Sequence, residues 1–285
     1  FPTVPFPNPE EAGALDMAIE QAREQGADLI IAVDPDADRC ALAVPDPTSE
    51  TGWSPLSGDQ IGSLLGEFLA SHGMKGSLAN SIVSSRLLSR IARAHGLEHH
   101  TTLTGFKWIA RAPGLGFGYE EAIGFCPDPA HVRDKDGIAT SVVAASLVAA
   151  LKAQGRSVWD ELERLARLHG LHVSSPLTFR VEEIEQIASG MARLRAQPPS
   201  VLAGSPVVEV SDLSQGYRGL PPTDGVLVLT EAGDRVIARP SGTEPKLKCY
   251  LEVILPVAEG EPLPWEQAHE RLDAIKAAFA EIIGL

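Results

Sequence analysis

AVDPDADRCALAV, residues 32–44, places three aspartates at alternate positions between two apolar runs. Asp34, Asp36 and Asp38 would repel one another in a compact loop unless a cation neutralised them. Carboxylate oxygens are the ligands that a hard ion such as Mg²⁺ prefers. An EF-hand is excluded, because the glycine and glutamate it needs are absent from their positions. The stretch therefore predicts a magnesium loop between two strands, with a solvated acidic turn as the alternative.

Length and charge bound the kind of protein. The chain has 285 residues, of which 44% are apolar and 22% charged, a globular composition long enough for two or three domains. Its formal net charge is −14, so no binding to nucleic acid or to an anionic membrane is expected. The longest apolar run, residues 138–151, is too short to cross a bilayer. An anionic substrate would have to be held by local cationic loops.

Cysteine usage and the start of the chain give two further indications. Cys40, Cys126 and Cys249 are far apart and odd in number, which fits neither a disulfide framework nor a zinc site. A reducing, cytoplasmic setting is therefore expected. The chain opens on the proline-rich segment FPTVPFPNPEE without an initiator methionine, which is typical of the middle of a protein.

Apolar periodicity predicts alternating strands and helices up to about residue 172. Helices are expected at 10–26, 57–73, 86–96, 136–155 and 157–170, and strands at 27–33, 40–45, 76–85, 99–105 and 117–125. Further along, strands are expected at 173–181, 206–213, 225–240 and 246–255, with helices at 182–196 and 265–283. The pattern predicts tandem α/β domains with mixed sheets, followed by a smaller α+β C-terminal domain. We place the domains at 1–75, 76–171 and 172–285.

A second candidate site is IARPSGTEPKLKCYLEV, residues 237–253, in which a tight turn joins two strands. Guanidinium, hydroxyl and backbone amide groups together form a good phosphate cradle, and two lysines follow them. The residues concerned are Arg239, Ser241, Gly242, Thr243, Lys246 and Lys248. A phosphate site is predicted here, against the alternative of a plain hairpin turn.

Three weaker stretches carry polar groups between apolar segments. GYEEAIGF, residues 118–125, has two adjacent glutamates that face opposite ways on a strand, so one can reach a ligand while the other is structural. TGFKW, residues 104–108, has a loop lysine, for which a surface position is the alternative. VRDKDGI, residues 132–138, has Arg133 and Lys135 before a helix, for which a capping cluster at the helix start is the alternative.

Together and in this order, these stretches resemble the α-D-phosphohexomutase family, the phosphoglucomutases and phosphomannomutases. DPDADR (34–39) is similar to the family's magnesium loop, TGFKW and GYEEAIGF to its sugar-recognition region, RDKDG (133–137) to its catalytic lysine segment, and RPSGTEPK (239–246) to its phosphate-binding loop. The resemblance runs from FPNPEE (6–11) to CYLEV (249–253). GFKWI with GYEEAIGF is most similar to the phosphopentomutase-like and glucose-bisphosphate-forming branch.

The resemblance implies an enzyme of four domains whose first domain carries a phosphoserine. No stretch here matches the Thr-Ala-Ser-His-like loop of that serine, so the chain is expected to begin inside the second domain and to be inactive alone. The implied reaction moves a phosphoryl group between C1 and C6 (or C5) of a sugar phosphate through a bisphosphate intermediate. Mg²⁺ and a sugar 1,6-bisphosphate activator are the implied cofactors. The implied partners are a phosphosugar and the missing N-terminal domain, in a monomer or dimer.

The resemblance also implies a role for each matched residue. Asp34, Asp36 and Asp38 would hold magnesium. Arg39 would contact the sugar phosphate near the metal, and Lys135 would contact the sugar or serve nearby proton transfer. The implied sugar site is Thr104, Gly105, Lys107, Glu120 and Ala122. The implied site for the non-reacting phosphate is Arg239, Ser241, Gly242, Thr243 and Lys248.

Two departures from the family pattern leave the sugar open between glucose, mannose and pentose phosphates. Ala122 stands where many members have serine, and Lys248 stands where some have arginine, which replaces a bidentate fork with a point charge. Two other functions also stay open. One is a phosphatase with an aspartyl nucleophile, in which Asp34 would be the nucleophile and Asp36 the acid. The other is a non-catalytic sugar-phosphate-binding member of the family.

Overall fold

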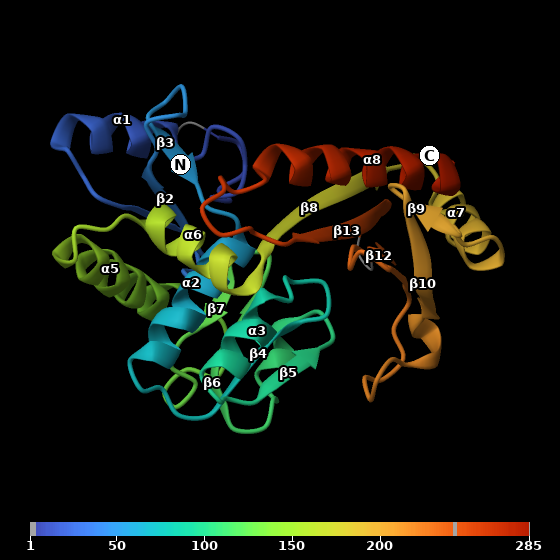
Figure 1. The fold of residues 1–285 in the computed structure, drawn as a ribbon, viewed down its shortest axis with the longest axis horizontal. Helices are drawn as coiled ribbons and strands as arrows, with labels where there is room; N and C mark the ends of the chain where they lie inside the picture. Colours follow the sequence, from blue (N-terminus) through green and yellow to red (C-terminus); the bar gives the residue numbers. More distant parts are fainter. Residues whose placement is uncertain (1–3, 242–243, 285) are drawn as a thin grey trace. The chain divides into compact units, whose positions relative to one another are not determined.

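The chain folds into two compact units, residues Phe1–Arg164 and Leu165–Leu285. A computed structural model describes residues 4–241 and 244–284. Figure 1 traces the elements of both units in chain order. Each unit has its own sheets and helices.

The first sheet of unit 1 is antiparallel and has the order β1-β2-β3. Its strands are β1 (Ile30–Val33), β2 (Cys40–Pro45) and β3 (Trp53–Pro55), with α1 (Asp16–Gln25) before them. Ile19 and Ala22 of α1 pack on Ile30 and Trp53 of the sheet. The helix expected from residue 10 begins only at Asp16, because Gly13 has a left-handed φ of 82° that a helix does not accommodate.

The second sheet of unit 1 is mixed, with the order β5-β4-β6-β7. In it β4 (Ser77–Ser81) runs parallel to β5 (His99–Thr102) and β6 (Leu115–Glu120), and β7 (Gly124–Cys126) is antiparallel to β6. The carboxyl ends of the three parallel strands meet at one edge, where α/β proteins commonly bind ligands. The helices of this part are α2 (Gly58–Ser71), α3 (Leu87–Ala94) and α4 (Phe106–Ile109).

Helix α2 belongs to the second sheet by its packing. It contacts β6 and α3, and a Cβ at Gly62 would lie 2.5 Å from the ring of Tyr119 on β6. Residues 58–71 therefore cover the sheet of residues 77–126, whereas the division at residue 75 assigned them to the preceding domain. Sequence periodicity identified the helix but carried no information on which sheet it would cover.

Two helices complete unit 1 and lead into unit 2. α5 (Gly137–Ala153) contacts β7, β2 and α2, and α6 (Val158–His169) crosses the boundary between the units. The two sheets are joined by a backbone bridge between Arg39 and Gly124. Among the described residues no single helix has the length and hydropathy of a membrane span. Helices α5 and α6 meet both criteria only when they are taken together, and this pair is bent by 89°.

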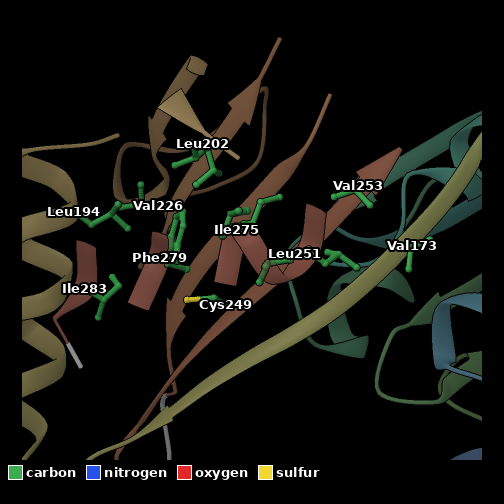
Figure 2. Packing of buried hydrophobic residues seen from close by; sticks show 14 of the residues in the cluster. Val173, Leu194, Leu202, Val226, Cys249, Leu251, Val253, Ile275, Phe279 and Ile283 are labelled. Atoms are coloured by element: carbon green, nitrogen blue, oxygen red, sulfur yellow. The ribbon is translucent and has the colours of Figure 1, made fainter. Parts of the chain in front are cut away.

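Within its described residues, unit 2 has an antiparallel sheet with the order β8-β13-β12-β11-β10-β9, two helices of its own and the end of α6. The elements are β8 (Leu171–Arg180), α7 (Ile184–Ala196), β9 (Val201–Leu202), β10 (Ser205–Asp212), the 3₁₀ turn η1 (Leu213–Gln215), β11 (Val226–Thr230), β12 (Arg235–Pro240), β13 (Lys246–Leu255) and α8 (Trp265–Ile283). Figure 2 shows side chains of α8, such as Phe279, meeting Val226 and Cys249 of the sheet. The α/β and α+β classes predicted from the sequence are confirmed.

Candidate active site

The three aspartates of the loop between β1 and β2 converge. One oxygen from each of Asp34, Asp36 and Asp38 lies within 4.8 Å of the others. Asp34 is buried, Asp38 is half-buried and Asp36 is exposed. The predicted cluster is therefore formed by the backbone of this loop, and one side of it is open to solvent.

Arg39 holds Asp34 in place. Its backbone N–H donates to Asp34 Oδ1 over 3.0 Å, and its Nε donates to Asp34 Oδ2 over 3.1 Å. Burial raises the pKa of Asp34, but the Arg39 amide, hydrogen bonds within the loop and the guanidinium outweigh it and lower the pKa below its usual value. Asp34 is thus a fixed, ionised carboxylate. Both of its oxygens accept a hydrogen bond from the neighbouring arginine.

The start of α5 closes on this loop. The backbone N–H of Gly137 donates to Ala37 O over 2.9 Å, and a Cβ at Gly137 would lie 2.7 Å from the carbonyl oxygens of Ala37 and Arg39. Ala37 itself has a left-handed φ of 56°. Only glycine allows this approach, so Gly137 brings the RDKDG segment to the aspartates. Asp136 caps the helix by accepting from the Ala139 N–H, as the capping interpretation expected.

Lys135 lies between the acidic loop and Phe106, in the segment predicted to recognise the sugar. Its Nζ lies 2.8 Å from Asp38 Oδ2 and 5.6 Å from the centre of the Phe106 ring at the start of α4. A Cβ at Gly124 would lie 2.5 Å from Lys135 Cδ, so the stem of the lysine crosses the start of β7. Burial lowers the pKa of Lys135, but the carboxylates of Asp38, Asp134 and Glu120 outweigh burial and raise the pKa above its usual value. Lys135 is a charged ammonium beside the acidic loop.

Glu120 faces the same cluster from the end of β6. Burial and the neighbouring Glu121 raise its pKa to about 7, although Lys135 and Arg39 act in the opposite direction. A carboxyl group with a pKa near neutrality can accept a hydrogen bond from a hydroxyl group or donate one to it. Such a group can also exchange a proton with a bound molecule.

Glu121 is held by two serines that sequence reasoning missed. Ser81 Oγ and Ser84 Oγ donate to Glu121 Oε2 over 3.1 and 3.0 Å. Ser81 is the last residue of the parallel strand β4 and Ser84 follows it, a position that is itself a signal for a binding edge. The two adjacent glutamates therefore have different surroundings, with Glu121 held by the two serines and Glu120 near Lys135. Glu121 lies in the turn after β6, so strand alternation is not the cause of the difference.

The remaining residues of the predicted sugar site lie near this edge, and within the described part of the chain no hydrogen bond ties them to the cluster. Thr104 and Gly105 lie between β5 and α4, and Gly105 has a left-handed φ of 101°. Lys107 is exposed, with its Nζ 5.8 Å from the Trp108 ring. Ala122 lies in the turn between β6 and β7. Arg39, Lys135 and Glu120 are brought together around Asp38, and Lys107 is not.

The predicted phosphate loop lies in unit 2, between β12 and β13. Arg239 and Lys248 are directly opposite each other on the two strands, and the Ser241 N–H donates to Lys246 O over 2.9 Å. Arg239 Nε is buried without a hydrogen-bond partner among the described residues. Gly242 and Thr243, the other two members of the predicted cradle, lie outside the described residues.

The acidic loop fits a hard divalent cation by its donors. All three side chains offer only carboxylate oxygens. Asp38 Oδ1 is buried and accepts no hydrogen bond within residues 4–241 and 244–284, and Arg39 Nε lies 3.7 Å from it, beyond hydrogen-bond distance. A buried acceptor without a hydrogen bond is costly unless a cation or water approaches it more closely. The donor set suits Mg²⁺ better than a soft metal.

Comparison with protein-family models assigns nearly the whole chain. Residues 1–48 match phosphoglucomutase/phosphomannomutase alpha/beta/alpha domain II, residues 57–168 match alpha/beta/alpha domain III, and residues 178–263 match the C-terminal domain. The chain belongs to the phosphoglucomutase/phosphomannomutase family. The α-D-phosphohexomutase resemblance inferred from the sequence motifs is thereby confirmed.

Similar proteins carry several names within the family. A probable phosphomannomutase of Haemophilus influenzae is 46% identical over 254 residues, which cover 88% of this chain and 51% of that protein. A phosphopentomutase of Mus musculus is 31% identical over 318 residues (99% and 50%), and a phosphoglucomutase of Staphylococcus aureus is 33% identical over 280 residues (90% and 50%). The chain spans about half the length of the curated relatives it matches.

Solved structures show the same fold at lower identity. The phosphoglucomutase parafusin of Paramecium superposes with a TM-score of 0.69 at 19% identity, covering 98% of this chain and 51% of that one. A phosphoglucomutase/phosphomannomutase family protein of Burkholderia thailandensis gives a TM-score of 0.65 at 18% identity, with 97% and 51% covered. At this sequence identity the structural match shows the fold and nothing more.

Proposed function

We propose that this chain carries the metal, sugar and phosphate sites of a phosphosugar mutase, which moves a phosphoryl group between C1 and C6 (or C5) of a sugar phosphate. The observation that carries the proposal is the convergence of Arg39, Lys135 and Glu120 on the acidic loop. The sequence similarity to proteins named phosphomannomutase, phosphopentomutase and phosphoglucomutase supports it. The family resemblance adds a bisphosphate intermediate, a sugar 1,6-bisphosphate activator and a phosphoserine as the phosphoryl carrier.

We assign the proposed roles from the contacts. Asp34, Asp36 and Asp38 would hold Mg²⁺, which when bound supplies positive charge that offsets the charge on a transferring phosphoryl group. Arg39 and Lys135 add two cations at the same place, and each is fixed by an aspartate. Glu120 accepts a hydrogen bond from a sugar hydroxyl or holds the proton exchanged there. Thr104, Gly105, Lys107 and Ala122 line the proposed sugar site less directly.

The family match argues against a phosphatase with Asp34 as the nucleophile. The models that match the chain are those of phosphoglucomutase/phosphomannomutase domains. We also propose that the domain division inferred at residue 75 lies before Gly58, since α2 packs on β6. The division near residue 171 is kept. The three buried, unpaired cysteines are compatible with the proposed cytoplasmic location.

A mutase assay with an aspartate variant tests the proposal. The complete gene product, with Mg²⁺ and a trace of glucose 1,6-bisphosphate, should interconvert the 1- and 6-phosphates of glucose or mannose, or the 1- and 5-phosphates of ribose. Asp36→Ala should remove most of this turnover without changing the circular dichroism spectrum, because Asp36 is exposed and supports no packing. Asp28→Ala, which removes an exposed carboxylate paired with Lys152, is the matched control. Phosphosugar binding without turnover would instead favour the non-catalytic family member.

A further inference from the structure

The C-terminal sheet turns a cationic face away from its helices. Leu247 and Cys249 of β13 are fully buried in the core that α7 and α8 cover. Successive residues of a strand point to opposite faces, so Lys246 and Lys248 lie on the other face. We call this side, opposite α7 and α8, the open face.

The strand register sets four cations side by side on the open face. Lys248 is paired with Arg239 of β12, and Lys246 is paired with Arg180, the last residue of β8. Directly opposite residues have Cβ atoms about 4.5–5.5 Å apart, and like charges at that distance destabilise a sheet. An anion bound beside two such adjacent pairs would relieve this repulsion, although the net charge of the chain is −14.

The chain itself supplies little of that compensation. Within the residues that the structure describes, Arg180, Arg239 and Lys248 have no side-chain hydrogen bond and no ion pair. Lys246 pairs with Glu244, an exposed carboxylate in the loop itself. The hydrogen bond from Lys246 lowers the pKa of Glu244, and the charges of Arg180 and Lys248 act in the same direction.

We propose that Arg180 belongs to the phosphate site of this unit, and that Glu244 competes with phosphate for Lys246. The inference deepens the proposed function and rests on its assignment of the Arg239 turn to phosphate. Arg180 and Arg239 lie on strands on either side of β13, offset by two residues along the strand direction. Neighbouring strands are about 4.8 Å apart and alternate residues of a strand about 6.8 Å apart, so the Cβ atoms of the two arginines are about 12 Å from each other. Two extended arginine side chains span that distance around one phosphate group.

Arg180 also accounts for the lysine at position 248. Lysine offers a point charge in place of the planar fork of arginine, and a site that has Lys248 loses one bidentate contact. The guanidinium of Arg180, on β8, supplies a second bidentate donor beside that of Arg239. No motif in the sequence marks Arg180, because it lies 59 residues before Arg239 and meets it only through the sheet register. The ligand class is a phosphate monoester dianion, recognised through its phosphate.

Phosphate titration of the 285-residue chain tests the inference. Inorganic phosphate is titrated calorimetrically into the wild type and the variants Arg180→Gln, Arg239→Gln and Lys276→Gln. Arg180→Gln should raise the dissociation constant about tenfold, the effect of one lost charge-assisted contact. Lys276→Gln, which removes one cation from α8, should leave it unchanged. Glu244→Gln should tighten binding, since the internal competitor is removed.

Melting temperatures separate an anion site from a structural role. Relief of like-charge repulsion should make Arg180→Gln melt higher than wild type without phosphate, and added phosphate should raise its melting temperature less. A lower melting temperature in both conditions would mean that Arg180 supports the sheet, which overturns the inference. If Arg239→Gln loses phosphate binding while Arg180→Gln keeps it, the role of Arg180 is refuted and the assignment of the Arg239 turn to phosphate is retained. If the wild-type chain binds no phosphate, both the role of Arg180 and the assignment of the turn are refuted.

Discussion

Glu120 is the residue whose charge state depends most on its surroundings in the proposed site. Its folded pKa of about 7 lies above the ordinary value of 4.5, because burial and Glu121 disfavour the ionised form. The folded protein therefore binds a proton that the unfolded chain has already lost between those two values. The resulting stabilisation is fully present below pH 4.5 and is lost as the pH rises through 7.

We therefore expect Glu120→Gln to change the pH dependence of stability. Without Mg²⁺, the variant should gain roughly 1–3 kcal/mol in unfolding free energy relative to wild type between pH 5 and pH 8, from the size of the pKa shift. Urea unfolding at the two pH values measures this. Glu20→Gln, on the exposed side of α1, is the control and should show no such difference. Parallel pH curves for wild type and Glu120→Gln would contradict the assignment of a raised pKa.

A cluster of residues close together in the sequence could be predicted, whereas contacts between residues that meet only through the fold could not. The acidic loop was recognisable because its three carboxylates repeat within five positions. Ser84 and Glu121 are 37 residues apart, and their contact depends on β4 and β6 lying parallel in one sheet. Phe106 under Lys135 is a contact of the same kind. Periodicity gives no access to such pairs.

Among the elements, helix α8 and the β11–β12 turn are fastened by one charged pair. Arg271 donates to both oxygens of Asp234, over 2.7 Å each, and Thr230 Oγ1 donates to the same carboxylate over 2.7 Å. Asp234 is buried and Arg271 is partly exposed. Removing the arginine leaves a buried carboxylate without its cation, which is costlier than the pair is stabilising.

Arg271→Ala should accordingly destabilise unit 2 by about 2–4 kcal/mol. Lys276→Ala on the same helix breaks only an exposed pair with Asp273 and should cost no more than about 0.5 kcal/mol. Adding Asp234→Asn to Arg271→Ala should recover part of the loss, because the unpaired charge is removed. Denaturant unfolding of the three proteins provides the measurement, and equal effects of the two single changes would refute the argument.

The ends of helices and strands were predicted most accurately where the local sequence pattern was strongest. The predicted ranges 246–255 and 265–283 coincide with β13 and α8, where the apolar pattern is regular and the ends are marked by proline and glycine. Residues 10–15 had helical spacing but form turns, since Gly13 adopts a left-handed backbone. Here the conformation of one residue outweighed the periodicity of its neighbours.

At the scale of the whole molecule, each unit has a hydrophobic core of its own. The core of unit 2 is built from its strands together with α7 and α8 (Figure 2). In unit 1 separate clusters lie under α1 and around α4. We expect two unfolding transitions in calorimetry, since multidomain chains commonly depart from two-state behaviour.

The variants described above assign these transitions. Arg271→Ala should lower only the transition of unit 2, and Glu120→Gln at pH 8 should raise only that of unit 1. Calorimetric scans of wild type and both variants, collected at one scan rate, make the comparison. A single transition that moves as a whole in both variants would show that the two units unfold together.

The buried cysteines give the chain its own reporters of local opening. Burial raises the pKa of Cys40 to about 11, and of Cys126 and Cys249 to about 12, so each thiol is protonated and unreactive in the folded protein. Cys40 and Cys126 lie on β2 and β7 in unit 1, and Cys249 lies on β13 in unit 2. A disulfide reagent can therefore label each thiol only when its strand opens. The order in which the three sulfurs are modified would rank the strands by opening free energy, with no probe introduced.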